Sequence, residues 1–212
     1  TTYSEDVTYW NSLGLKEQEI AIGGSGDGSD LLTFYEPDAL LNEDAREWMA
    51  YSAGNTDGQF RESAKAEAAE INTDKGYYAR HYENSRRRKL LSKALPLFDG
   101  QHETQYQESA AANFPCLIWT GGKVKNCGNY PSSEIKKSSV IDADGRAKHT
   151  YTDILGKTLA ISTGDDSPTY YIYDTKDRLK AVCSSGIELM DTLNMWRYDY
   201  DSLSRISAKR IP

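Results

Sequence analysis

Apolar and polar residues alternate in short runs along most of the chain, and turn-forming residues separate the runs. Residues 6–23, DVTYWNSLGLKEQEIAIG, alternate on both sides of a turn-like Asn-Ser-Leu-Gly, which predicts two paired strands. The Gly-, Asp- and Ser-rich residues 23–30 predict a flexible hairpin loop. From Cys116 onward the alternation resumes, with Gly, Asp, Ser and Asn between the runs. We therefore predict a mainly β fold built from antiparallel hairpins.

One segment has a clear helical composition. Residues 61–71, RESAKAEAAEI, consist of good helix formers with Glu in the first turn, and Asn72 is placed to end the helix. Residues 31–51 leave two interpretations open. Helix propensity favours a short helix within this segment, whereas Pro37 and the turn pattern described below favour a second hairpin.

The middle of the chain lacks a clear period. Residues 72–115 are polar and aromatic, so we expect irregular or extended backbone there. The change of pattern at Phe114 and Pro115 marks a boundary. We therefore predict two parts: residues 1–115, with degenerate hairpins and one helix, and residues 116–212, with repeated hairpins.

A short pattern recurs through both parts. Asp or Asn is followed three places later by Gly and then by a basic residue, and an aromatic or β-branched residue often comes first. The copies begin at Asn11, Asp38, Asp142, Asp153, Asp174 and Asp201. Their other defining residues are Gly14, Gly145, Arg146, Gly156, Lys157, Tyr173, Asp177, Arg178, Tyr200 and Arg205. The copies are irregularly spaced, so each is best explained as a separate local structure.

The chemistry of the pattern predicts a bulged hairpin turn. An Asp or Asn side chain at the first position accepts a hydrogen bond from the backbone two residues on. Gly three places later suits a left-handed residue, and Asp177 tolerates that conformation better than most. Leu41 does not, so we expect the turn at Asp38 to be rebuilt or helical.

The residues flanking each turn are expected to connect the strands. The Tyr before a turn and the basic residue after it lie on paired strands, where ring and cation can stack. A single hairpin is marginally stable, so several must add side by side into a larger sheet.

These residues carry a resemblance to a known family. The Y-D-x-x-G-R pattern of YDTKDR and YDSLSR resembles the YD repeat of the Rhs and teneurin families. Residues 7–60 resemble the segment that precedes the repeats in bacterial Rhs-type surface proteins, and residues 141–161 and 170–182 resemble their consecutive turns. The chain departs from the pattern at Leu15, where Arg is expected, at Leu41 and Asn42, which replace Gly-Arg, and at Asp177 and Ser204, which replace glycines.

The resemblance implies a secreted or cell-surface scaffold without catalytic activity. Family members place a self-cleaving core and a variable C-terminal toxin far downstream, so the chain is expected to be an N-terminal fragment or a truncated form. Its expected partner is the remainder of the repeat array, and an isolated fragment with an open sheet edge is expected to self-associate. No cofactor is expected.

Charge and hydropathy argue against two classes of protein, general nucleic-acid binders and membrane-spanning proteins. A net charge of −7 argues against general nucleic-acid binding, and the basic run at residues 86–89 is best explained as a solvated face or a contact for an acidic partner. The apolar runs are too short for a membrane span.

Metal and phosphate motifs are incomplete. The loop at residues 23–30 lacks the Gly-Lys-Ser/Thr of a phosphate loop, and DADG at residues 142–145 lacks the later ligands of a calcium loop. His81, His102 and His149 have no paired spacing.

The cysteines leave alternatives open. Cys116 and Cys127 are compatible with a disulfide in an oxidising compartment, with free thiols, or less readily with a zinc site that also uses a histidine. We predict no metal site and no catalytic residues.

Exposed aromatic residues offer an alternative function. Tyr accounts for 15 residues against 4 Phe, a bias that suits half-buried sheet surfaces. Trp10, Trp119, Tyr171 and Trp196 are candidates for stacking on a carbohydrate or for contacting another surface protein. The competing interpretation is that they form the core of the sheet.

Overall fold

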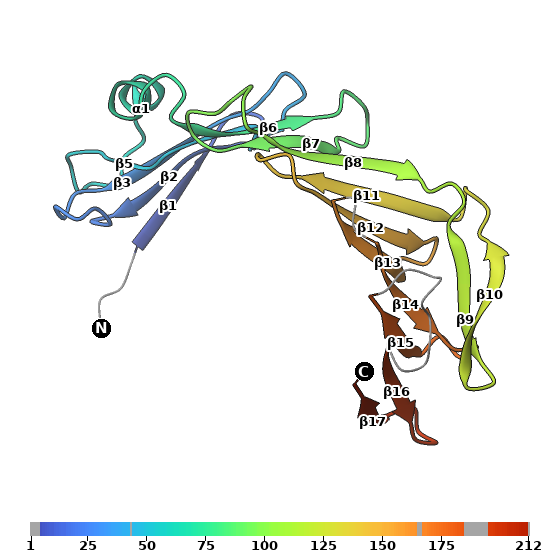
Figure 1. Cartoon of the computed structure of the whole chain (residues 1–212). Coiled ribbons are helices and arrows are strands. Elements are labelled where there is room, and N and C mark those ends of the chain that lie inside the picture. Colours follow the sequence, from blue (N-terminus) through green and yellow to red (C-terminus); the bar gives the residue numbers. More distant parts are fainter. Residues whose placement is uncertain (1–4, 43, 165–166, 185–194, 212) are drawn as a thin grey trace. The chain divides into compact units, whose positions relative to one another are not determined.

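The computed structural model describes residues 5–42, 44–164, 167–184 and 195–211. Seventeen strands and one helix occur among them, and the strand pairings are antiparallel with a single parallel contact (Figure 1). The predicted mainly β fold with one short helix is confirmed. The chain forms two compact units, residues 1–105 and 106–212. The division falls within strand β8 (Thr104–Ala110), whereas the sequence places the boundary at the start of β9 (Pro115–Thr120).

The first unit is a set of antiparallel strands with the helix on part of it (Figure 1). Its elements are β1 (Glu5–Trp10), β2 (Lys16–Ile22), β3 (Leu31–Glu36), β4 (Arg46–Trp48), β5 (Tyr51–Ser52), α1 (Ala64–Asn72), β6 (Tyr77–Tyr82) and β7 (Leu90–Ala94). Strand β2 pairs with β1 and β3, and β3 also pairs with β4 and β5. The sheet continues from β4 through β6 to β7 and the first residues of β8. Strand β3 is therefore the element that joins the two groups of pairings.

Small residues allow helix α1 to lie close to the sheet. Ala64 and Ala68 are buried against a core that includes Leu32, Trp48 and Tyr77, and the helix packs on β3 and β5. It spans Ala64–Asn72, so it begins later than the predicted residue 61.

Two expectations for the first unit need correction. The helical alternative for residues 31–51 is wrong, because this segment forms strands β3 to β5. For residues 72–115 the extended alternative is confirmed over three segments, which form the regular strands β6, β7 and β8, and the irregular alternative is wrong for them. In β8 no residue is buried, so the strand lacks the buried apolar positions that would mark it in the sequence.

The second unit is an antiparallel meander with an added hairpin (Figure 1). After β9 its strands are β10 (Lys123–Asn129), β11 (Ile135–Ile141), β12 (Ala147–Asp153), β13 (Thr158–Thr163), β14 (Thr169–Tyr173), β15 (Leu179–Cys183), β16 (Met195–Tyr200) and β17 (Ile206–Arg210). Strands β11 to β16 each pair with the next along the chain, and β9 pairs with β10. The core includes Ile135, Ile172 and Met195, which are almost fully buried.

Candidate functional site

The repeated sequence pattern has one hydrogen-bonding arrangement. In the copy at Asp174, the Oδ1 atom accepts hydrogen bonds from the backbone N–H groups of Lys176 and Arg178, at 2.9 and 3.0 Å. The Asp177 N–H donates to the Asp174 carbonyl, and the Asp174 N–H donates to the Arg178 carbonyl. The same four bonds occur in the copies that begin at Asn11, Asp38, Asp142, Asp153 and Asp201. All six copies are therefore the same turn.

The fourth residue of each turn is left-handed. The φ angles are 71° at Gly14, 81° at Gly145 and Gly156, and 58° at Asp177, which confirms the predicted conformation at these positions. The expectation for Leu41 is wrong: its φ is 62°, and the turn at Asp38 keeps its four hydrogen bonds. Those bonds outweigh the steric cost of a branched side chain at positive φ.

Leu41→Gly is therefore expected to stabilise the protein. Relief of the left-handed strain exceeds the entropy cost of glycine, and we expect a gain of roughly 0.5–1 kcal/mol in the free energy of unfolding. Urea unfolding of the full chain measures it. The matched control is Leu40→Gly in the same turn, where φ is not positive and the change should destabilise. Equal effects at both positions would contradict the strain at Leu41.

In the last two copies the turn carboxylate also binds the basic residue of its own copy. While Oδ1 of Asp174 holds the backbone, its Oδ2 accepts a hydrogen bond from Arg178 Nε at 2.9 Å and forms an ion pair with Arg178 Nη2 at 2.8 Å. The Arg205 Nε–Asp201 Oδ2 distance is also 2.8 Å. Each Asp thus supports the turn with one oxygen and the next strand with the other.

Stacking joins neighbouring copies, and this corrects the expectation that it occurs within one copy. Lys157 Nζ lies 5.0 Å from the ring centroid of Tyr173, and the Arg178 guanidinium carbon lies 4.9 Å from that of Tyr200. Each basic residue therefore contacts the tyrosine of the following copy. The prediction failed because it considered only the two strands of one hairpin. The tyrosine ring instead contacts the basic residue of the preceding hairpin.

The tyrosine hydroxyls make a second contact between the same copies, and we call each such pair of contacts a junction. Tyr173 Oη donates to the Thr158 carbonyl at 2.8 Å, and Tyr200 Oη donates to the Leu179 carbonyl at 2.7 Å. Thr158 and Leu179 directly follow the basic residues Lys157 and Arg178. Both junctions therefore have the same two parts, a cation over the ring and a carbonyl that accepts from the hydroxyl.

The junctions are charged at neutral pH. Burial raises the pKa of Asp174, but hydrogen bonds from Arg178 and backbone N–H groups outweigh it and hold the pKa below its usual value. Burial lowers the pKa of Lys157, but Asp177 and Asp153 more than offset this and raise it. A carboxylate with a lowered pKa stabilises the fold above its unfolded pKa and loses this contribution as pH falls through the folded value.

The first unit contains a related contact. Lys16 Nζ lies 4.4 Å from the ring centroid of Tyr35, and the Tyr35 hydroxyl donates to Glu19 Oε2 at 2.9 Å. Here a carboxylate replaces the carbonyl as acceptor. Lys16 follows the turn at Asn11 and Tyr35 precedes the turn at Asp38, so this contact also joins successive copies.

A family comparison covers these first two turns. Residues 1–110 match the model of a domain of unknown function, DUF6443, which is more than half of the chain. The chain belongs to the DUF6443 family. No curated protein matches it. The DUF6443 segment contains the turns at Asn11 and Asp38, whereas the four later turns lie beyond it.

The last turn of this DUF6443 protein leaves accessible the two groups that a following tyrosine would contact, a basic side chain and the carbonyl after it. The Arg205 side chain is 73% exposed and contacts Asp201. Every residue of β17 is exposed, and among the described strands β17 pairs with β16 alone. The Ile206 carbonyl holds the position that Thr158 and Leu179 hold at the earlier junctions.

The aromatic candidates differ in exposure. Trp10 in the first unit is 58% exposed, and Trp196 in the second is 40% exposed with Lys209 Nζ 4.2 Å from its ring centroid. Tyr171 is half-buried, and its strand partner Val182 is also the partner of Trp196. Tyr171 and Trp196 therefore share one face of the sheet. Trp119 packs against the core instead.

The structure bears on the disulfide alternative and on a membrane span. No disulfide joins Cys116 to Cys127 in the described structure; Cys127 is exposed and Cys116 is half-buried. In the described part of the chain, no helix is long and apolar enough to cross a membrane.

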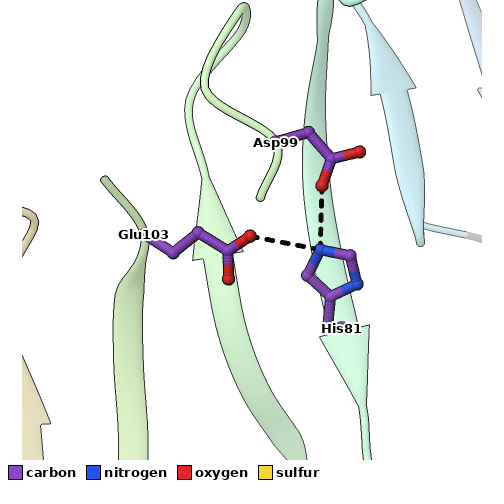
Figure 2. Close-up of side chains that lie close together, drawn as sticks. All are labelled: His81, Asp99 and Glu103. Carbon is purple, nitrogen blue, oxygen red and sulfur yellow. Dashed lines mark hydrogen bonds and ion pairs between the residues drawn. The ribbon is translucent and has the colours of Figure 1, made fainter. Parts of the chain in front are cut away.

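One cluster in the DUF6443 segment was not predicted from the sequence. Asp99 Oδ1 and Glu103 Oε1 lie 3.0 and 3.5 Å from His81 Nε2 (Figure 2). The four-residue spacing of the two acids is a weak signal, but nothing in the sequence places a histidine from β6 beside them. The β7–β8 connection brings the three together.

Proposed function

We propose that this chain is a non-catalytic structural module of a secreted or cell-surface protein of the Rhs/YD-repeat type. In this proposal it contributes β-hairpins to a scaffold or shell that encloses or presents a C-terminal effector. The observation that supports it most directly is the junction between successive turns, made by Tyr173 with Lys157 and by Tyr200 with Arg178.

The junction supports a structural role because its polar groups are used to join hairpins. The Asp side chains bind backbone N–H groups and the basic residues, and the Tyr hydroxyls bind backbone carbonyls. A device of this kind can be repeated indefinitely, because each hairpin presents a cation and a carbonyl to the next. Arg205 and the Ile206 carbonyl are the next such pair, at the start of the accessible strand β17.

A fused hairpin tests the proposal. The full chain is extended by a linker as long as residues 184–194 and a second copy of residues 195–210, which carries a duplicate of Tyr200. If the scaffold grows through these junctions, the duplicate hairpin pairs with β17. The β17 amides of the fusion then exchange with solvent at least about tenfold more slowly than those of the parent chain. Hydrogen–deuterium exchange with mass spectrometry measures this.

Two matched variants identify the junction in that fusion. Replacing the duplicated tyrosine with Phe removes the donor to the Ile206 carbonyl, and Arg205→Ala removes the cation. Each should reduce the added protection of β17. Exchange of β17 in the fusion as fast as in the parent chain would count against a scaffold that extends by this route.

A second candidate is a carbohydrate- or protein-binding surface. It is favoured by Tyr171 and Trp196, which share a face of the sheet, and by the 40% exposure of Trp196. Flat aromatic rings on an accessible face suit stacking on sugars. A glycan array with the full chain and a Trp196→Ala variant distinguishes the two functions, because only the binding surface predicts a signal that depends on Trp196.

A further inference from the structure

His81, Asp99 and Glu103 bring three ligand atoms together in the first unit. His81 is on strand β6, and both acids are in the connection between β7 and β8 (Figure 2). The His81 Nε2 and the two carboxylate oxygens all lie within 4.8 Å of one another. In Figure 2 both carboxylates point toward the same ring nitrogen.

Groups outside the cluster hold the two carboxylates in place. The Tyr77 hydroxyl donates to Asp99 Oδ2 at 2.8 Å, and the Gly100 N–H donates to Glu103 Oε1 at 2.8 Å. Tyr77 is itself fixed, because it is 6% exposed and its ring centroid lies 5.0 Å from that of Trp48. Such outer hydrogen bonds orient ligands and are typical of built metal sites.

The charges of the cluster favour a cation. The Asp99 and Glu103 side chains are only 16% and 18% exposed, and both face one imidazole. Arg46, whose guanidinium carbon lies 5.1 Å from the Tyr77 ring centroid, also acts electrostatically on Asp99. Arg46 offsets part of this negative charge, and the two carboxylates that face one imidazole supply two oxygen ligands and one nitrogen ligand for a cation.

The distances and the ligand types indicate which ion. Two ligands bound at about 2.0–2.2 Å lie roughly 3.0–3.5 Å apart, and the nitrogen–oxygen distances here are 3.0 and 3.5 Å. Imidazole suits Zn²⁺ and related transition metals, whereas Ca²⁺ and Mg²⁺ prefer oxygen ligands throughout. The His81 side chain is 48% exposed, which leaves a side open for water.

We propose that His81, Asp99 and Glu103 bind Zn²⁺ or a related first-row divalent ion, with a solvent ligand in the remaining position. The ion ties the β7–β8 connection to strand β6 and stabilises the first unit. This site does not depend on the scaffold function proposed above.

Zinc chloride added to the metal-free full chain tests the site. Isothermal titration calorimetry should give one ion per chain. Thermal unfolding with free Zn²⁺ at about 100 times the dissociation constant should show a midpoint higher by roughly 5–10 °C. Millimolar Ca²⁺ should neither displace the zinc nor reproduce the shift.

Variants locate the ion within the chain. His81→Gln, Asp99→Asn and Glu103→Gln should each weaken Zn²⁺ binding by at least about tenfold, and Tyr77→Phe should weaken it less through the orientation of Asp99. Glu62→Gln changes the same charge at an exposed position outside the cluster and should have no effect. Circular dichroism of each metal-free variant checks that it is folded.

Co²⁺ on the unaltered chain gives a readout that needs no variant. A d–d absorption spectrum without a thiolate charge-transfer band is expected for nitrogen and oxygen ligands. A thiolate band would place the ion on a cysteine and overturn the proposal. So would Zn²⁺ affinity that is unchanged in all three ligand variants, or no binding at millimolar zinc.

Discussion

Asp30→Ala is expected to lower the free energy of unfolding by about 2–5 kcal/mol, because it leaves two backbone donors without an acceptor. The Asp30 side chain lies at the end of the Gly-rich loop and is 1% exposed. Its Oδ1 accepts from the Gly23 N–H at 3.0 Å, and its Oδ2 accepts from the Gly58 N–H at 2.8 Å. The carboxylate thus joins both ends of the loop to Gly58, which lies 28 residues later in the sequence.

Two further changes separate this role from a general loss of charge. Asp30→Asn keeps one acceptor oxygen but turns an amide donor toward the other N–H, so the loss should lie between those of wild type and Asp30→Ala. Asp27→Ala removes a carboxylate from the same loop that also accepts a backbone hydrogen bond, from the Ser29 N–H, and it should destabilise less because water can reach the donors at this exposed position. Urea unfolding, followed by circular dichroism, gives the midpoints. Equal midpoints for Asp30→Ala and wild type would contradict the anchoring role.

Asp30 also marks a limit of sequence analysis. Residues 23–30 were predicted to be a flexible hairpin loop, and composition alone supports that view. The buried end of the loop depends on Gly58, which no local pattern connects to it. A carboxylate at the edge of a polar loop therefore has the same sequence signature whether it is solvated or buried.

The turns could be predicted because their chemistry is local. The Asp174 side chain bonds to residues two and four places along the chain, so the six copies can be recognised from adjacent letters. Leu41 shows where local reasoning fails, since the hydrogen bonds of the turn dominate over the preference of one side chain.

Contacts between copies were not predictable in the same way. The partner of Arg178 is Tyr200 because of how strands β15 and β16 pair, and the intervals between copies in the sequence are irregular. The cluster of His81 with Asp99 and Glu103 has the same origin, since it depends on the path of the β7–β8 connection. The sequence therefore predicts the repeating unit better than the contacts that join the units.

Gly76→Ala is expected to be among the most destabilising single substitutions in the first unit, with a loss of roughly 2–4 kcal/mol. Gly76 lies between helix α1 and strand β6, where an added Cβ would be 2.3 Å from the Asn72 carbonyl oxygen and 2.4 Å from the Asn72 Cβ. These are contacts with backbone and with the root of a side chain, so no rotamer change relieves them.

The surrounding hydrogen bonds prevent the backbone from moving away. The Gly76 N–H donates to the Thr73 carbonyl at 3.1 Å, and its carbonyl accepts from the Met49 N–H at 2.8 Å. Asn72 is held from the other side, because its Nδ2 donates to the Met49 carbonyl at 2.9 Å. Relief of the clash must therefore break bonds that join α1, β6 and the chain at Met49.

Gly26→Ala is the matched control for this substitution. Gly26 lies in the loop at residues 23–30, has no positive φ, and has no atom within 4 Å of an added Cβ. Alanine there should be neutral or should stabilise by up to about 1 kcal/mol, because it restricts the unfolded chain. Thermal and urea unfolding of both variants compare the two positions. Similar stabilities for Gly76→Ala and Gly26→Ala would show that the helix–strand junction can relax, and that the tight contact at Asn72 does not constrain the fold.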